Sequence, residues 1–228
     1  MMKSGNYSHL IAHTRMGLLS ATFALFAAAA SPLLGAQAGD EVLERVLVGV
    51  DLTAGTNMAA AVAPDGSSLI INVQGVLWTL PPSGGQAAEL TPAEMDAYEP
   101  VWSPDGRHVT FYAYTDDSFS IWMMDADGSD RVQLTDSSHD ARYPTFSPDG
   151  GTIYYASDAD GGYGIWALNL AEQKQQKLVD ASETGYLIPQ TPRFAGAGNA
   201  VYPVVSPDAD TLAFVIDGPQ SLLAVRPL

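Results

Sequence analysis

The sequence contains no cysteine, which excludes both a disulfide framework and a cysteine-ligated zinc site. Charged residues are also few, at 16% of the chain, whereas 46% of the residues are hydrophobic. This balance is typical of a globular protein with a buried core and argues against a disordered chain. Helical periodicity is nearly absent after residue 38, so we expect an all-β structure there.

Positive charge is scarcer still. Ten Lys and Arg residues stand against 26 Asp and Glu residues, which gives a net charge of −16. Without residues 1–38, 8 basic residues would face the same 26 acids, for a net charge of −18. A surface this acidic repels phosphate backbones and anionic lipid headgroups, so we expect no nucleic-acid partner.

The first 38 residues have the composition of a secretory signal peptide. Lys3 and Arg15 are their only Lys or Arg residues, an apolar run follows at 16–30, and the small residues Ala36 and Ala38 offer a cleavage site. The apolar run is too short to span a bilayer comfortably, although an uncleaved anchor is the alternative. We therefore predict a signal peptide at 1–38, no stable membrane span after its cleavage, and an exported protein, either periplasmic or secreted.

A proline-aspartate tetrapeptide recurs four times in the rest of the chain. Its prolines are separated by 40, 44 and 59 residues. Proline presets φ for a turn, aspartate hydrogen-bonds the turn backbone, and glycine tolerates positive φ. We predict a tight turn between two strands at each copy, built by Pro64, Asp65, Gly66, Ser103, Pro104, Asp105, Gly106, Ser147, Pro148, Asp149, Gly150, Ser206, Pro207 and Asp208.

The similarity between the copies extends well past the turns. A shift of 44 residues places Pro100 on Pro144 and Trp122 on Trp166. Because aromatic and β-branched residues alternate with small or polar ones, each copy reads as a set of half-buried strands. Trp78 holds the same position as Trp122 and Trp166, which indicates packing between copies. In the second copy we expect strands near 100–103, 107–114, 119–125 and 131–135.

Four antiparallel strands in roughly 40 residues form a propeller blade, whose faces must pack on neighbouring blades. We therefore predict a β-propeller of four-stranded antiparallel blades over residues 39–228. About four blades are present, at approximately 57–91, 100–135, 144–179 and 201–226.

The last copy lacks a fourth strand, and two interpretations remain open. A strand at 46–53 resembles the fourth-strand endings of other copies and could complete the last blade, which would close the ring. Alternatively, the chain is the front part of a longer propeller, and the ring is incomplete.

The pattern P-x-W/F-S-P-D-G followed by I-W-x-M-D-x-D-G-S and L-T resembles the TolB-type (PD40) propeller repeat over about residues 50–228. The stretch from GTNMAAAVAPDG to GVLWTLPPSGGQAAELT also resembles the N-terminal propeller module of exported amidohydrolases. The first resemblance implies a periplasmic role with protein partners. The second implies a fused catalytic domain outside this sequence.

Signatures of catalysis are missing from the sequence. The only histidines after residue 38 are His108 and His139, so the His-x-His motif of a metal site is absent. The Gly-x-Ser-x-Gly motif of serine hydrolases is absent as well. We expect no catalytic residues and no cofactor. Asp125, Asp127 and Asp130 are the best candidate set of ligands, because oxygen donors at this spacing could contribute to a calcium site. A hairpin turn explains the same residues.

Two functions follow from these observations. The first is a non-catalytic, exported propeller that binds proteins or serves as a scaffold. The alternative is an accessory propeller of a truncated exported hydrolase of the amidohydrolase type, whose catalytic domain is absent from this chain.

Overall fold

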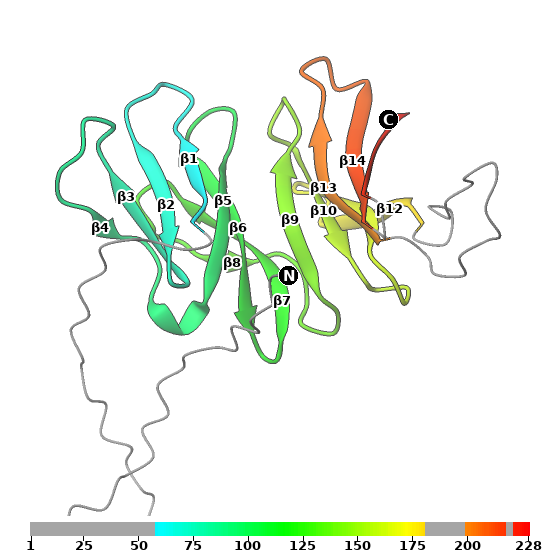
Figure 1. Cartoon of the computed structure of the whole chain (residues 1–228), viewed down its shortest axis with the longest axis horizontal. Coiled ribbons are helices and arrows are strands. Elements are labelled where there is room, and N and C mark those ends of the chain that lie inside the picture. Colours follow the sequence, from blue (N-terminus) through cyan, green and yellow to red (C-terminus); the bar gives the residue numbers. More distant parts are fainter. Residues whose placement is uncertain (1–57, 181–198, 218–220) are drawn as a thin grey trace, which may run out of the picture. The chain divides into compact units, whose positions relative to one another are not determined.

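The computed structural model describes residues 58–180, 199–217 and 221–228 (Figure 1). These residues form antiparallel sheets, and the helical structure among them is a single 3-10 turn, η1 at Ala93–Met95. The described part of the chain contains no helix with the length and hydropathy that a membrane span requires. The predicted signal peptide at 1–38 and the predicted strand at 46–53 lie outside the described residues.

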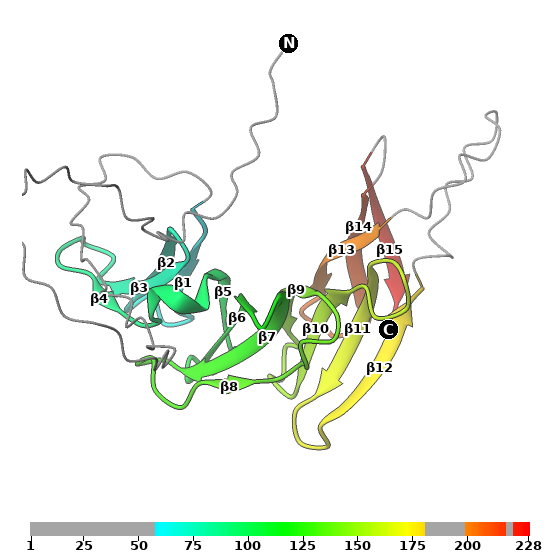
Figure 2. The same ribbon diagram turned by 90° about the horizontal axis from the view of Figure 1, so that it is seen from below.

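The strands group into four successive sheets, which we call blades 1 to 4 (Figure 2). Blades 1 to 3 have four strands each, and each strand pairs with the next along the chain. Blade 4 has three strands among the described residues. The strands are β1 Ala60–Val62, β2 Leu69–Val73, β3 Val76–Leu80 and β4 Ala88–Glu89; β5 Ala97–Trp102, β6 His108–Thr115, β7 Ser118–Asp125 and β8 Val132–Gln133; β9 Ala141–Phe146, β10 Thr152–Ser157, β11 Gly164–Asn169 and β12 Lys174–Val179; and β13 Asn199–Val205, β14 Thr211–Asp217 and β15 Leu222–Pro227.

The all-β propeller fold predicted from the sequence is confirmed. The second copy shows how closely the pattern specifies the strands, because β5, β6 and β7 begin and end within three residues of the expected limits. Its fourth strand, β8, is shorter than expected. Alternation explains the faces of these strands: on β7, Ile121 points to one side of the sheet and Trp122 to the other.

The hydrophobic core lies between the blades rather than within any one of them. Buried residues of blades 1 and 2 form one cluster, those of blades 2 and 3 a second, and those of blades 3 and 4 a third. Trp122 packs on the first cluster and Trp166 on the second, as the repeat predicts. Burial of one large aliphatic side chain stabilises the folded protein by about 1.5–3 kcal/mol. Because these side chains are buried between blades, each blade depends on its neighbours for stability.

The first strands of neighbouring blades lie next to one another, since β1 contacts β5, β5 contacts β9 and β9 contacts β13. Successive turns also meet. A side chain added at Gly106 would contact the Pro64 ring at 3.6 Å, and one added at Gly150 would contact the Pro104 ring at 3.6 Å. The turn of one blade is thus seated against the turn of the blade before it.

Candidate functional site

The repeated turn is held by a local network between its serine and its aspartate. The Ser103 hydroxyl donates to Asp105 Oδ1 at 2.6 Å and accepts from the His108 backbone N–H at 2.9 Å. Ser103 is 3% exposed, so its hydroxyl is occupied and shielded. Ser147 and Ser206 make the same contacts with their own aspartates and following strands. These serines stabilise turns and are not placed as nucleophiles.

The turn aspartates have a consistent electrostatic environment. The pKa of Asp105 lies well below its ordinary value, because the Ser103 hydroxyl, the Arg107 backbone N–H and the Arg107 side chain all stabilise its charged form. The pKa values of Asp149 and Asp208 are also lowered, first by the hydroxyl of the turn serine. Blade 1 has Ala63 in place of this serine, and there Ser67 takes over as the partner of Asp65.

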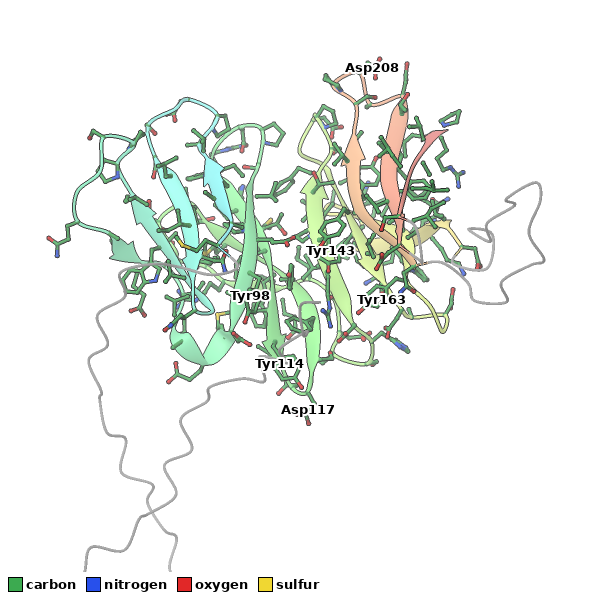
Figure 3. All side chains as sticks on the ribbon, viewed as in Figure 1. Tyr98, Tyr114, Asp117, Tyr143, Tyr163 and Asp208 are labelled. Atoms are coloured by element: carbon green, nitrogen blue, oxygen red, sulfur yellow. The ribbon has the colours of Figure 1, made fainter. Side chains whose placement is uncertain are left out.

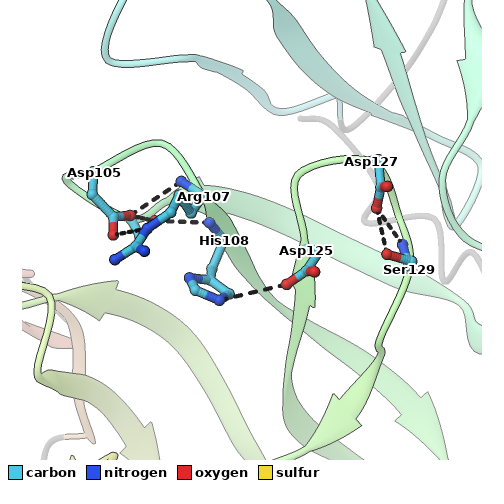
Figure 4. Close-up of polar contacts among 7 residues, drawn as sticks. Asp105, Arg107, His108, Asp125, Asp127 and Ser129 are labelled. Atoms are coloured by element: carbon cyan, nitrogen blue, oxygen red, sulfur yellow. Dashed lines mark hydrogen bonds and ion pairs between the residues drawn. The ribbon is translucent and has the colours of Figure 1, made fainter.

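The candidate calcium ligands do not converge. The Asp127 carboxylate accepts from both the backbone N–H and the hydroxyl of Ser129, at 2.9 and 2.6 Å. Asp125 Oδ1 faces His108 Nε2 at 3.4 Å (Figure 4). Among the described residues, Asp130 included, no group of three or more His, Asp or Glu side chains is arranged to hold a metal ion. The hairpin turn accounts for Asp127, whose pKa is lowered first by the Ser129 hydroxyl.

An open pocket of about 600 Å³ lies where the turns of blades 1 and 2 meet. Its lining includes one large aromatic ring and three carboxylates, from Trp102, Asp65, Asp105 and Asp127. The Trp102 indole N–H donates across the blade boundary to the Ala61 carbonyl at 3.2 Å, so the ring is fixed in position. A pocket with this lining favours a cationic group over an anionic one.

A second feature, which the sequence analysis did not predict, is a β-bulge at the same place on three first strands. Glu99, Tyr143 and Tyr202 have φ angles of +47°, +58° and +54°. Each precedes a buried proline, and the strand register shifts at each of them. Positive φ is costly for such residues, by about 1–3 kcal/mol each, and bulges of this kind redirect side chains at functional sites. A repeated residue-proline pair is the sequence signal that marks them.

The bulges bring aromatic rings from neighbouring blades together. The ring centroids of Tyr143 and Tyr202 are 4.0 Å apart, and those of Tyr143 and Tyr112 are 5.6 Å apart. Tyr98 stacks on Tyr112 at 5.6 Å, which continues the row within blade 2. Figure 3 shows Tyr98 and Tyr143 on the ribbon. We refer to Tyr98, Glu99, Tyr112, Tyr143 and Tyr202 as the tyrosine row.

The tyrosine row is accessible at one end and partly buried at the other. Tyr202 is 47% exposed. Its pKa is raised, first by a hydrogen bond with Tyr143 and then by burial. Burial alone raises the pKa of Glu99. A partly buried carboxylate whose charge is under-solvated gains from an added cationic partner, because that partner replaces the lost hydration.

Beside the tyrosine row, Asp140 connects blades 2 and 3. Its carboxylate accepts from the Phe119 backbone N–H at 2.9 Å, from Arg142 at 2.6 Å and from the Tyr163 hydroxyl at 2.9 Å. Burial alone would raise the pKa of Asp140, but these three donors together lower it. The Arg142 guanidinium also lies 4.0 Å from the centre of the Phe119 ring. The Phe119 ring in turn lies edge-on to Tyr98 and Tyr112, with centroids 6.2 and 5.5 Å apart, so these contacts adjoin the tyrosine row.

Comparisons with known proteins agree with the repeat and the fold. The TolB beta propeller domain (PD40) matches residues 83–216, which is more than half of the chain. A protein assigned to TolB from Agrobacterium tumefaciens is 21% identical, with a TM-score of 0.55 over 75% of this chain and 76% of its own. TolB from Acinetobacter baumannii is 20% identical, with a TM-score of 0.57 over 75% of this chain and 41% of its own.

A puromycin-hydrolyzing peptidase from Mycobacterium tuberculosis is 17% identical, with a TM-score of 0.54 over 73% of this chain and 29% of its own. No curated protein has a sequence significantly similar to this one. At these identities the solved structures show a shared fold alone, and this chain spans less than half of the Acinetobacter TolB. Because the domain match covers most of blades 2 to 4, the chain belongs to the TolB beta propeller domain family.

Proposed function

We propose that this chain is a non-catalytic, exported propeller that binds a protein partner through the tyrosine row. The observation that carries the proposal is the recurrence of Glu99, Tyr143 and Tyr202 in the left-handed conformation on three consecutive blades. Strain that recurs at equivalent positions and presents accessible side chains is a feature of binding sites. Tyrosine is also among the residues that contribute most to protein interfaces.

The charge of the chain favours a basic partner segment. The net charge is −16, and the open pocket between the first two turns is lined by carboxylates. Under-solvated Glu99 adds an acidic group to the tyrosine row itself. A partner segment that alternates arginine with apolar residues could pair with Glu99 and stack its guanidinium groups on the tyrosines. Export through a signal peptide at 1–38 would place the encounter outside the cytoplasm.

The proposal can be tested with two short labelled peptides that differ only in charge. One alternates arginine with leucine, and the other has glutamate in place of each arginine. We expect the purified chain to bind the arginine peptide, with weaker binding at higher salt because part of the attraction is electrostatic. Fluorescence anisotropy measures both affinities.

Tyr202→Ala should weaken binding of the arginine peptide at least about tenfold, which corresponds to about 1.4 kcal/mol. Tyr154→Ala, which removes a partly exposed tyrosine outside the row, is the matched control. Equal binding of both peptides, or unchanged affinity in Tyr202→Ala, would contradict the proposal.

A second function is favoured by the likeness to the peptidase, in which the matching segment is less than a third of a longer chain. On this alternative, the propeller is an accessory module of an exported hydrolase of the amidohydrolase type. An antibody against blades 2 and 3 separates the two functions in cells that make the protein. A product of about 24.1 kDa or slightly less favours the first function, whereas a much larger product favours the second.

A further inference from the structure

The pocket where the turns of blades 1 and 2 meet differs in composition from the corresponding place between blades 2 and 3. Backbone hydrogen bonds identify the corresponding residues. The N–H of Ala126 donates to the Arg107 carbonyl at 2.9 Å. The N–H of Leu170 donates to the Gly151 carbonyl at 3.0 Å, so Ala126 corresponds to Leu170. Ser67 corresponds to Arg107, since the backbone N–H of each donates to the aspartate of its own turn.

Small residues leave the pocket open at the first boundary. Ser67 and Ala126 line it, whereas the second boundary has Arg107 and Leu170 at these positions. Leu170 packs on the hydrophobic cluster shared by blades 2 and 3. The pocket volume of about 600 Å³ lies within the range of about 300–1,000 Å³ that is usual for small-molecule sites. Its two walls come from neighbouring blades that are both described, so the hollow is a property of this boundary.

The chain itself places a guanidinium group against the corresponding aspartate of blade 2. Arg107 Nε donates to Asp105 Oδ2 at 2.7 Å (Figure 4). Blade 1 has Ser67 in place of this arginine, and Asp65 accepts from the backbone N–H of Ser67 at 2.9 Å. No Lys or Arg side chain in the described part of the chain forms an ion pair with Asp65 or Asp127. These two carboxylates can therefore take a cationic group from outside the chain.

Trp102 gives the pocket an aromatic wall in a fixed position, because its indole N–H is bonded to the Ala61 carbonyl at 3.2 Å. A guanidinium group is planar and weakly hydrated, so it can stack on an aromatic ring while its N–H groups bond to a carboxylate. The pKa of Asp65 is lowered, first by a hydrogen bond with the neighbouring serine hydroxyl. That carboxylate is therefore ionised at neutral pH.

We propose that this pocket binds a guanidinium group, which pairs with Asp65 and stacks on Trp102. The bound group has the same role at Asp65 that Arg107 has at Asp105. It belongs either to a free small molecule or to an arginine residue of a partner protein, and the chemistry of recognition is the same for both. None of the residues of the tyrosine row lines the pocket, so this site is separate from the proposed peptide site.

The test follows the indole N–H signal of Trp102 in NMR spectra of the ¹⁵N-labelled chain. The chain has four tryptophans, and Trp102→Phe identifies the signal of this one. We expect butylguanidinium to shift the Trp102 signal in a saturable manner and to leave the other indole signals in place. Butylurea, which has a similar shape without the charge, should cause no shift. A Trp102 signal that does not respond to butylguanidinium, or that responds equally to butylurea, would overturn the inference.

Two arginine substitutions sharpen the test. Ser67→Arg supplies a guanidinium from within the chain, as blade 2 does, and should raise the Kd for butylguanidinium at least about tenfold. Gly151→Arg is the matched control, because it makes the same change in charge at the corresponding position of blade 3, where a Cβ has only ordinary contacts. The remaining indole signals show whether each variant is folded. Unchanged affinity in Ser67→Arg, or an equal loss in Gly151→Arg, would contradict the proposal.

A blocked alanine–arginine–alanine tripeptide separates the two sources of the guanidinium group. Tighter binding than that of butylguanidinium supports an arginine of a partner protein, whereas equal or weaker binding supports a free small molecule. Tyr202→Ala should leave the response of the Trp102 signal unchanged, so failure of this site and failure of the peptide site are distinguishable. Loss of the response in Tyr202→Ala would show that the pocket is not a separate site.

Discussion

Blades 2 and 3 differ from blades 1 and 4 in burial more than in sequence. Ile121 and Leu223 hold the same position in their repeats, yet the first is 0% and the second 74% exposed. Phe146 and Val62 differ in the same way on the opposite face. The difference arises because blades 2 and 3 have a neighbour on each side among the described residues, whereas blades 1 and 4 have one each.

This comparison shows that a blade is not a unit of stability. Each sheet buries its two faces only between neighbours, so stability is roughly a sum over interfaces, as in other repeat proteins. The residues of an end blade have the same hydrophobic pattern as those of an inner blade, but some of them are exposed. The same substitution should therefore have different effects in inner and end blades.

The largest expected difference is between Ile121→Ala and Leu223→Ala. Removing the buried Ile121 side chain should lower the free energy of unfolding by about 2–5 kcal/mol. Removing the exposed Leu223 side chain should change it by less than about 0.5 kcal/mol. Urea denaturation followed by tryptophan fluorescence measures both values. Equal losses would show that the Leu223 side chain is covered within one chain.

A smaller difference is expected at the last residue of the repeated turn. Gly106 has a φ of +70°, and Ala209 holds the same place in blade 4 with a φ of +62°. Because this conformation is costly for alanine, Gly106→Ala should destabilise the protein by about 1 kcal/mol, whereas Ala209→Gly should stabilise it by about 0.5–1 kcal/mol. Thermal or urea unfolding of the two variants checks these opposite signs. If both substitutions destabilise, contacts other than backbone strain dominate at the turn.

The smallest expected effect concerns the stability of the protein at low pH. The pKa of Asp105 is lowered in the folded state, so its stabilising contribution is complete above the unfolded value near about 4 and is lost as pH falls toward the folded value. Asp208 has no arginine partner in its turn. Asp105→Asn should therefore flatten the decline of the unfolding midpoint below pH 4 more than Asp208→Asn does. The reverse order would indicate that the Arg107 contact contributes little.

Much of the fold was predictable because turns and strand alternation are local properties. Pro104, Asp105 and Gly106 specify a turn by their own backbone preferences, and Ile121 and Trp122 mark the two faces of one strand. Each signal is weak by itself, but because the signals recur four times along the chain they predicted a propeller, which is confirmed. The predicted signal peptide at 1–38 and strand at 46–53 remain predictions, since those residues lie outside the described ranges.

The tyrosine row was not predicted because it depends on pairing between strands. Pro100, Pro144 and the proline after Tyr202 were visible as repeated residues, but a bulge exists only when two residues oppose one on the next strand. The exposure of residues in blades 1 and 4 could not be predicted for a related reason. Leu223 has the sequence environment of a core residue, and its exposure depends on which blades are present.

The contact between each turn glycine and the preceding proline limits how such a protein can diversify. At that end of the blades, Gly106 and Gly150 leave room for ordinary contact with a neighbouring ring but not for a longer segment. At the other end of β6 and β7, the hairpin residues Asp116 and Asp117 are exposed. Insertions that create new specificities should accumulate at the hairpin end, while the proline end keeps a constant length and sets the spacing of the repeat.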